Sequence, residues 1–184
     1  MDKYFYHGIE PYHGTFGYSL DIMLKILKEG LKTRKEVHNH YDEDLSHVCL
    51  YKKDDDLDYS DQRWFFKSAR AGWIDHCFVF ILSPAVEAVK ASHEDTDLLD
   101  EWRSIGDIPP SKIKGIALPM EAIKEYLEED LDDEEVKQDQ EKLQKNLELI
   151  TEYALEKNLI LVDSDMPNFT DELDESLKQN NNTK

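Results

Sequence analysis

Residues 77–82, with the sequence CFVFIL, form a nearly continuous apolar run that sets the frame of the fold. A strand with one wet face alternates apolar and polar residues, so a run without alternation predicts a strand covered on both faces. Ser83-Pro84 ends the run, because proline has no N–H to give to a ladder. The run therefore predicts a central strand of a layered sheet.

The chain upstream of this run reads as strand, loop and helix. Residues 3–9, KYFYHGI, form an aromatic-rich strand, and residues 10–18 contain the proline and glycines of a loop. Ser19 is the predicted N-cap of a helix that ends at Gly30. One face of that helix carries apolar residues at spacings of three and four, namely Leu20, Met23, Leu24, Leu27 and Leu31.

Shorter elements flank the central run. Residues 47–51 predict a strand, and the acidic residues 54–61 predict a solvated loop. Residues 64–71 fit either a short helix or an irregular aromatic segment. Downstream, the sequence predicts a short helix at 85–91, a strand at 98–105, a turn at 106–110 and a strand at 114–118.

The character of the chain changes after Pro119. Residues 120–127 and 136–155 predict helices on either side of a dense acidic run, 128–135, and residues 159–162 predict a short strand. The acidic run fits a solvated connection between helices, with a partner-binding segment as the alternative. We therefore expect an α+β domain in three parts. They are a core at 1–119, an acidic helical extension with a short strand packed on it at 120–170, and a flexible tail at 171–184.

Composition limits the function classes. The chain has 184 residues, 40% of them hydrophobic, and a formal net charge of −19, which suits one domain with an appendage. Such a negative surface repels phosphate backbones, so nucleic-acid and membrane-surface binding are not expected. There is no signal-like N-terminus and no apolar run of roughly 20 residues. Cys49 and Cys77 lie in strand-like runs, which favours buried thiols in a cytoplasmic protein.

Two other kinds of site are weakly indicated. The side chains of His38, His40, His47 and Cys49 do not have the spacing of a zinc site, so no metal is expected. Nucleophilic catalysis by a cysteine is also disfavoured. His76 and Cys77 would point to opposite faces of a strand, and His47 and Cys49, which would share a face, have no cysteine-protease signature near them.

Three short motifs occur in an informative order. A strand ends in His7-Gly8, a helix carries ILKEGL at 26–31, and Glu101 precedes GDIPPSKI at 106–113. In this order the chain resembles the ADP-ribosyltransferase superfamily over residues 3–118. The last motif is similar to that of bacterial toxins that ADP-ribosylate DNA bases (DarT-like), and the whole is similar to PARP-like mono-ADP-ribosyltransferase domains. The resemblance implies a split, strongly bent β-sheet core with peripheral helices, and NAD as substrate.

The resemblance assigns Glu101 as the catalytic residue. Cleavage of nicotinamide from ribose develops positive charge at the anomeric carbon, as in glycoside hydrolysis. A fixed carboxylate stabilises that charge, can hold the 2′-hydroxyl, and can orient the acceptor. The alternative is that Glu101 is one more acid in an acidic segment.

Other residues would bind the dinucleotide by the same resemblance. His7 would bind the adenosine-side ribose and Gly8 would let the backbone approach the ligand, with His13, in YHGT, as the alternative to His7. Tyr51 would stack on nicotinamide. Arg34 would contact the pyrophosphate, or else only neutralise the C-terminus of a helix.

The sequence also departs from the family pattern. Leu99 stands two residues before Glu101, where enzymes that modify arginine have Glu or Gln, so arginine is disfavoured as acceptor. The acidic charge does not suit a DNA acceptor. We expect a mono-ADP-ribosyltransferase with an unidentified macromolecular acceptor, or an NAD glycohydrolase. A 2′-phosphotransferase reaction is disfavoured because the chain is arginine-poor. The alternative is a non-catalytic adaptor that docks a basic partner through the acidic C-terminal third.

Overall fold

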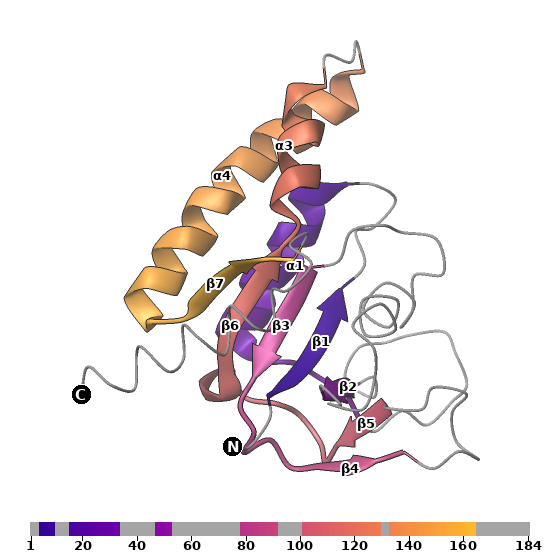
Figure 1. Ribbon diagram of the computed structural model, residues 1–184. Coiled ribbons are helices and arrows are strands. Elements are labelled where there is room, and N and C mark those ends of the chain that lie inside the picture. The colour runs from indigo at the N-terminus through magenta and orange to yellow at the C-terminus, as the bar shows by residue number, and fades with distance from the viewer. Residues whose placement is uncertain are drawn as a thin grey trace.

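The computed structural model describes residues 4–9, 15–33, 47–52, 78–91, 101–129 and 133–164. These residues form strands and helices in one mixed arrangement, so the predicted α+β class is confirmed (Figure 1). The elements in chain order are β1 Phe5–Ile9, α1 Phe16–Glu29, β2 Cys49–Lys52, β3 Phe78–Leu82, β4 Ala88–Lys90, β5 Glu101–Ser104, a 3-10 turn Pro110–Lys112, β6 Ile113–Leu118, α3 Met120–Glu128, α4 Glu134–Lys157 and β7 Ile160–Asp163.

The strands described form a seven-stranded sheet in the order β4-β5-β2-β1-β3-β6-β7. Only β6 and β7 run parallel, and every other neighbouring pair is antiparallel. All five residues of β3 are buried, so the prediction of a central strand covered on both faces is confirmed. In Figure 1, β4 and β5 lie at one end of the sheet, and α4 lies with β7 at the other.

Alternating side chains divide the interior into two clusters. The larger one, the main core, lies under the helices. The smaller one, the second cluster, consists of Tyr6, Tyr51, Val79, Ile81 and Ala117. Strand residues of the main core sit one position away from those of the second cluster, as strand alternation requires. The main core contains, among others, Phe5, Leu50, Phe78, Phe80, Leu82 and Ile116 from strands and Leu20, Met23, Leu27, Ile123, Leu143 and Ile150 from helices.

Helix α1 begins three residues before the expected cap, so the prediction of Ser19 as N-cap is wrong. Thr15 is the N-cap, and its side chain makes no capping hydrogen bond. Ser19 is buried inside the first turn, where its Oγ donates to the Thr15 carbonyl at 2.9 Å. The ring of Phe16 explains the early start, because it packs edge-on against Phe78 and beside Tyr126.

The predicted helix at 85–91 is also wrong. Residues 84–87 form a turn, and Ala88–Lys90 is strand β4, paired with β5. The pairing supplies hydrogen-bond partners 12 to 16 positions downstream, and the pattern of residues 85–91 alone does not show them. The uncertain segment at 64–71 and the expected tail at 171–184 lie outside the described residues.

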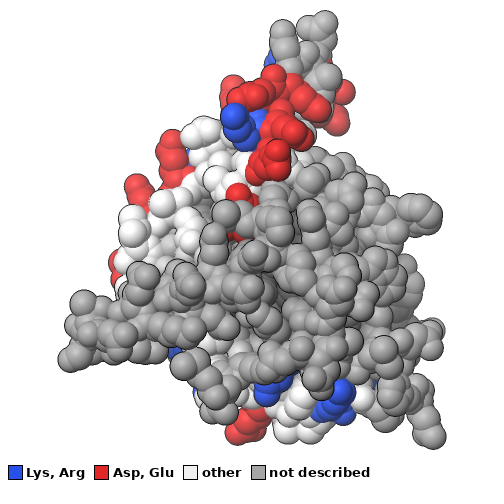
Figure 2. Space-filling view, in the orientation of Figure 1, with Lys and Arg blue, Asp and Glu red and all other residues white. Residues whose placement is uncertain are grey.

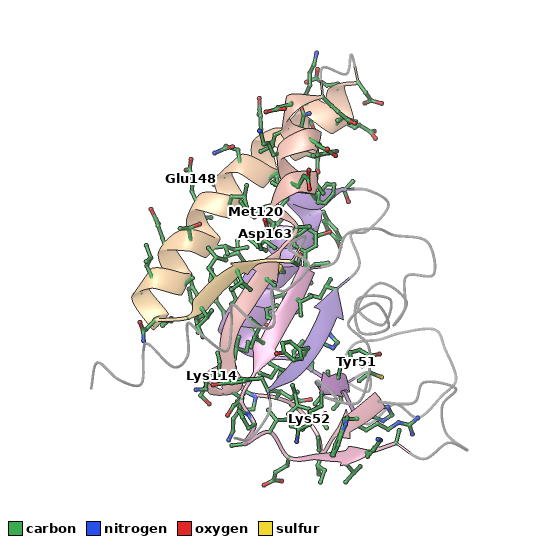
Figure 3. The ribbon with its side chains drawn as sticks, in the orientation of Figure 1. Tyr51, Lys52, Lys114, Met120, Glu148 and Asp163 are labelled. Carbon is green, nitrogen blue, oxygen red and sulfur yellow. The ribbon has the colours of Figure 1, made fainter. Side chains whose placement is uncertain are left out.

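The C-terminal elements are tied to the sheet and to α1. Strand β7 pairs in parallel with β6, and the carboxylate of Asp163 accepts the first backbone N–H of α3, from Met120, at 3.2 Å. Figure 3 shows these two side chains close together where β7 ends and α3 begins. The carboxylate of Asp139, on α4, accepts the N–H groups of Gly17 and Tyr18 at 2.9 and 3.2 Å. Both helices thus receive their N-terminal caps from another part of the fold.

Candidate functional site

The three strands that carry His7, Tyr51 and Glu101 are immediate neighbours in the sheet. They are β1, β2 and β5, and β2 lies between the other two. The register pairs Tyr51 with Tyr6 on one side and with Glu101 on the other. Segments separated by about fifty residues of chain thus meet within two strand spacings, roughly 10 Å.

The imidazole of His7 spans the place where β1 and β2 separate. Recorded pairing between these strands covers Phe5 and Tyr6, and at the next position His7 Nδ1 lies 2.9 Å from the Cys49 carbonyl oxygen. A carbonyl only accepts, so this contact places the ring proton on Nδ1 and leaves Nε2 as an acceptor. The side chain of His7 thus makes a hydrogen bond to β2 where the backbone pairing has ended, and its Nε2 keeps a lone pair that can accept another hydrogen bond.

His7 is held in its neutral form. The side chain is half-buried, and burial of the ring lowers the pKa of His7 below its ordinary value of 6.5, while the hydrogen bond to Cys49 opposes the shift. Desolvation disfavours the charged form of a histidine. At neutral pH this ring is therefore a hydrogen-bonding group without charge.

His7 and Tyr51 belong to different faces of the sheet. Phe5 and Ile9, two positions on either side of His7, pack in the main core, whereas Tyr6 packs with Tyr51 in the second cluster. Alternation therefore puts His7 on the helix side, with its ring turned to the gap between β1 and β2. The structure brings the two residues to adjacent strands without making them face one another.

Tyr51 is deeply placed. Only 4% of its surface is exposed, and it packs in the second cluster (Figure 3). Stacking on a nicotinamide ring would require part of this cluster to open. Gly8 pairs with Val79 on the same face as Tyr6, and its φ is not positive. The backbone conformation at Gly8 therefore does not itself require glycine.

Two of the sequence motifs contact each other at the other end of β5. Leu31, after α1, and Ile108, in the turn after β5, exchange two backbone hydrogen bonds of 2.9 Å each. Gly30 has φ +86°, and a β-carbon there would collide with the Ile108 carbonyl oxygen. Asp107 accepts the Thr33 N–H at 2.7 Å, and this bond lowers the pKa of its carboxyl. Hydrogen bonds therefore join the segment after α1 to the turn after β5, and they fix the position at which β5 ends.

Ser104 is a positioning residue that the sequence analysis missed. It is 5% exposed, its Oγ accepts the Val48 N–H at 2.8 Å, and the hydroxyl donates to the Gly106 carbonyl at 2.7 Å. It joins the start of β2 to the turn after β5. The available signal was a serine at the end of the strand EWRS, and such a serine is common in structures of every kind.

Several predicted residues lie outside the described part of the chain. These are Arg34, His13, His38, His40 and Cys77, and only the backbone of Glu101 is described. Cys49 is a half-buried free thiol. Within the described ranges, no three His, Cys, Asp or Glu side chains gather closely enough to hold a metal ion.

Comparison with known proteins adds no relative. No protein-family model matches the chain, and no curated protein is significantly similar to it in sequence. None of the helices in the described segments combines the length and apolar composition needed to cross a bilayer. The functional argument therefore depends on the arrangement of residues in the sheet.

Proposed function

We propose that the chain is an NAD-dependent mono-ADP-ribosyltransferase for a macromolecular acceptor, or hydrolyses NAD when water is the acceptor. The observation that supports this proposal is the adjacency of β1, β2 and β5, with Tyr51 and Glu101 paired in the ladder and the His7 ring turned toward the gap between β1 and β2. The proposal needs these three strands to lie side by side. The alternative order, in which β5 pairs elsewhere, would have separated Glu101 from both other residues.

The proposed roles follow from the chemistry of each group. The neutral His7 ring accepts a hydrogen bond from a ribose hydroxyl through Nε2, because Nδ1 is committed to Cys49. The carboxylate of Glu101 stabilises the oxocarbenium-like ribose as the bond to nicotinamide breaks. The nucleophile of the acceptor, or water, then forms the new bond to the anomeric carbon and loses its proton, and nicotinamide leaves with the bonding electron pair.

The first experiment measures NAD binding by calorimetry and nicotinamide release by chromatography. Wild type is expected to bind NAD, and Glu101→Gln is expected to lose about 10²–10³-fold in turnover while retaining binding. Glu148→Gln is the matched control, since Glu148 is exposed on α4, far from Tyr51 in Figure 3. Equal turnover in wild type and Glu101→Gln would show that this carboxylate is not catalytic.

The second candidate is a non-catalytic adaptor for a basic partner. One observation favours it: exposed carboxylates crowd the corner between α3 and α4 (Figure 2). They include Glu125, Glu128, Glu129, Asp133, Glu134 and Glu135. Absence of NAD binding at millimolar concentration would overturn the transferase proposal and leave the adaptor as the better explanation.

A further inference from the structure

An open hollow of about 510 Å³, which we call the α1–α4 hollow, lies where the start of α1 meets the start of α4. Its lining consists of Thr15, Tyr18, Glu135, Gln138, Asp139 and Lys142. Figure 1 shows the start of α4 at one end of the molecule and β5 near the other. The hollow is therefore a separate place from the strands considered above, and a side chain bound in it would contact two helices at once.

Contacts between the two helices fix the floor of the hollow. The Asp139 carboxylate accepts the N–H groups of Gly17 and Tyr18 at 2.9 and 3.2 Å, and the Tyr126 hydroxyl at 3.0 Å. A β-carbon at Gly17 would lie 2.5 Å from the Asp139 carbonyl oxygen, so the two helices are in close contact there. The hollow thus has a rigid base.

The hollow is negatively charged. The groups that donate to Asp139 carry no charge of their own, so they do not cancel the charge of this carboxylate. Glu135 is exposed and adds a second carboxylate. The ammonium of Lys142 lies 2.5 Å from the carboxylate of Asp21, which neutralises it. A cation is therefore attracted to the hollow.

The ring of Tyr18 adds an aromatic surface beside these charges. Tyr18 is 46% exposed, and the Lys142 ammonium lies 5.7 Å from its ring centroid. Aromatic rings attract cations, and they also pack against the hydrocarbon stems of arginine and lysine. A basic side chain therefore fits the hollow through its stem as well as through its charge.

Negative charge continues from the hollow onto the corner between α3 and α4 (Figure 2), and Glu135 belongs to both. The side-chain amide of Gln140 donates to the carbonyls of Tyr126 and Glu129 at 2.7 and 2.9 Å, which holds the end of α3 beside α4. The last turn of α3 has acidic residues and no basic one, although the C-terminus of a helix favours cations. A cation bound at this corner would relieve that repulsion.

We propose that the α1–α4 hollow and the adjoining corner bind a lysine- or arginine-rich segment of a partner protein. One basic side chain of the segment lies in the hollow against Tyr18, and the neighbouring ones face the carboxylates of the corner. Charge complementarity selects this occupant, because a chain with net charge −19 repels an acidic partner. The proposal does not rest on NAD turnover, since such a surface serves the protein acceptor of a transferase and the partner of an adaptor equally.

The test measures the fluorescence anisotropy of a labelled peptide of alternating arginine and serine as the full chain is added. The same peptide with glutamate in place of arginine is expected not to bind. Gln138→Lys puts a cation into the hollow and is expected to weaken the arginine peptide about five- to tenfold. Gln144→Lys makes the same charge change at an exposed position of α4, and is expected to stay within about twofold of wild type. It lies on another face, because residues two apart on a helix, such as Lys142 and Gln144, do not face each other.

Tyr18→Ala tests the ring while the charge of the chain stays constant. It is expected to weaken the arginine peptide about three- to tenfold, through the lost contact of a basic side chain with the ring. Leu155→Ala is the matched control, because Leu155 is 77% exposed near the other end of α4. That variant is expected to bind the peptide as wild type does.

The opposite results would overturn the proposal. Equal losses in Gln138→Lys and Gln144→Lys would show attraction to the total charge of the chain and not to a site. Unchanged affinity in Gln138→Lys or in Tyr18→Ala would exclude the hollow from the binding surface. Failure of wild type to prefer the arginine peptide over the glutamate peptide would contradict the proposal directly. A wild-type dimer in sedimentation that Gln138→Lys dissociates would make a second copy of the chain the occupant instead.

These titrations contain no NAD. A failure of the transferase proposal therefore leaves their result unaffected, and the two proposals are tested separately.

Discussion

Carboxylates are used differently in the two halves of this molecule. In the C-terminal third, Asp139 accepts the N–H groups of Gly17 and Tyr18 and the hydroxyl of Tyr126, the last at 3.0 Å. In the β1-β2-β5 region, the acid of interest, Glu101, lies in a ladder whose backbone groups pair with β2 and β4. In the first region, carboxylates accept the backbone N–H groups at helix N-termini. In the second region, the backbone groups of the strands form hydrogen bonds with one another.

The comparison shows that acidity in the sequence does not indicate where an acid will act. The C-terminal third has a strongly charged exterior, yet it contributes Leu143 and Ile150 to the main core and buries Asn146 against α1. The Nδ2 of Asn146 donates to the Gly17 carbonyl at 3.1 Å and to Asp21 at 2.8 Å. We therefore expect changes there to affect stability first, and changes near β5 to affect NAD first.

The largest expected effect is that of Leu143→Ala on α4. Leu143 has 0% exposure and lies in the main core, so the truncation should cost about 2–5 kcal/mol of unfolding free energy. Urea denaturation measures the cost. Leu155→Ala, on the same helix but with 77% of Leu155 exposed, is the control and should change the value by at most about 0.5 kcal/mol. Equal effects from the two variants would mean that α4 is not anchored as described.

A smaller effect, with an informative sign, is expected for Gly17→Ala. In an exposed helix, alanine is favoured over glycine by about 1 kcal/mol. At Gly17 a β-carbon would lie 2.5 Å from the Asp139 carbonyl oxygen and 3.0 Å from the Leu143 nitrogen. Since α1 and α4 would have to separate, we expect a net loss of about 1–3 kcal/mol.

Denaturant unfolding of Gly17→Ala decides the sign. Lys25→Ala, at an exposed position of α1, serves as the control and should stay within about 0.5 kcal/mol of wild type. A more stable Gly17→Ala would show that a methyl group fits between α1 and α4. It would contradict the expectation that changes in the C-terminal third act first on stability.

The smallest expected effect concerns His7 and pH. Burial lowers its pKa in the folded state below 6.5, so as pH falls through 6.5 the unfolded chain binds the proton first. The stability associated with neutral His7 is therefore present above pH 6.5 and is lost as pH falls toward the folded pKa. The slope for one group is at most about 1.4 kcal/mol per pH unit.

Unfolding free energies of wild type and His7→Gln, measured between pH 7.5 and 5, test this. As pH falls, the unfolding free energy of wild type should decrease more than that of His7→Gln. The contributions of the six other histidines cancel in the difference between the two proteins. A constant difference would show that His7 titrates normally. In wild type, NAD binding is expected to weaken over the same pH range, because a protonated Nε2 no longer accepts a hydrogen bond.

Hydrophobic pattern predicted most of the elements. The strand at 77–82, the helices after Pro119 and the turn at Gly106 were all read from local spacing, and the described elements confirm them. Local spacing failed at the start of α1 and at 85–91. In both places the deciding partners lie outside the local segment. They are Phe78 and Asp139 for the helix, and β5, 12 to 16 positions away, for the strand.

The site was predictable only as a list of residues. Motif order indicated the strands of His7 and Glu101 but gave no reason to choose Ser104, although that residue stands between Glu101 and GDIPPSKI. The depth of Tyr51 and the hydrogen bond from His7 to Cys49 depend on which strands pair and in what register. Register is set by packing across the whole sheet, so no local window contains it.

The sequence by itself determined the α+β class, the buried central strand and the elements that carry the candidate residues, because periodicity and turn residues are local properties. Only the tertiary structure decided the strand order, the face on which His7 lies, and the use of Asp139 and Asp163 as helix caps. Those features join residues separated by 12 to more than 120 positions. Their free energy comes from contacts that exist only when the chain has folded.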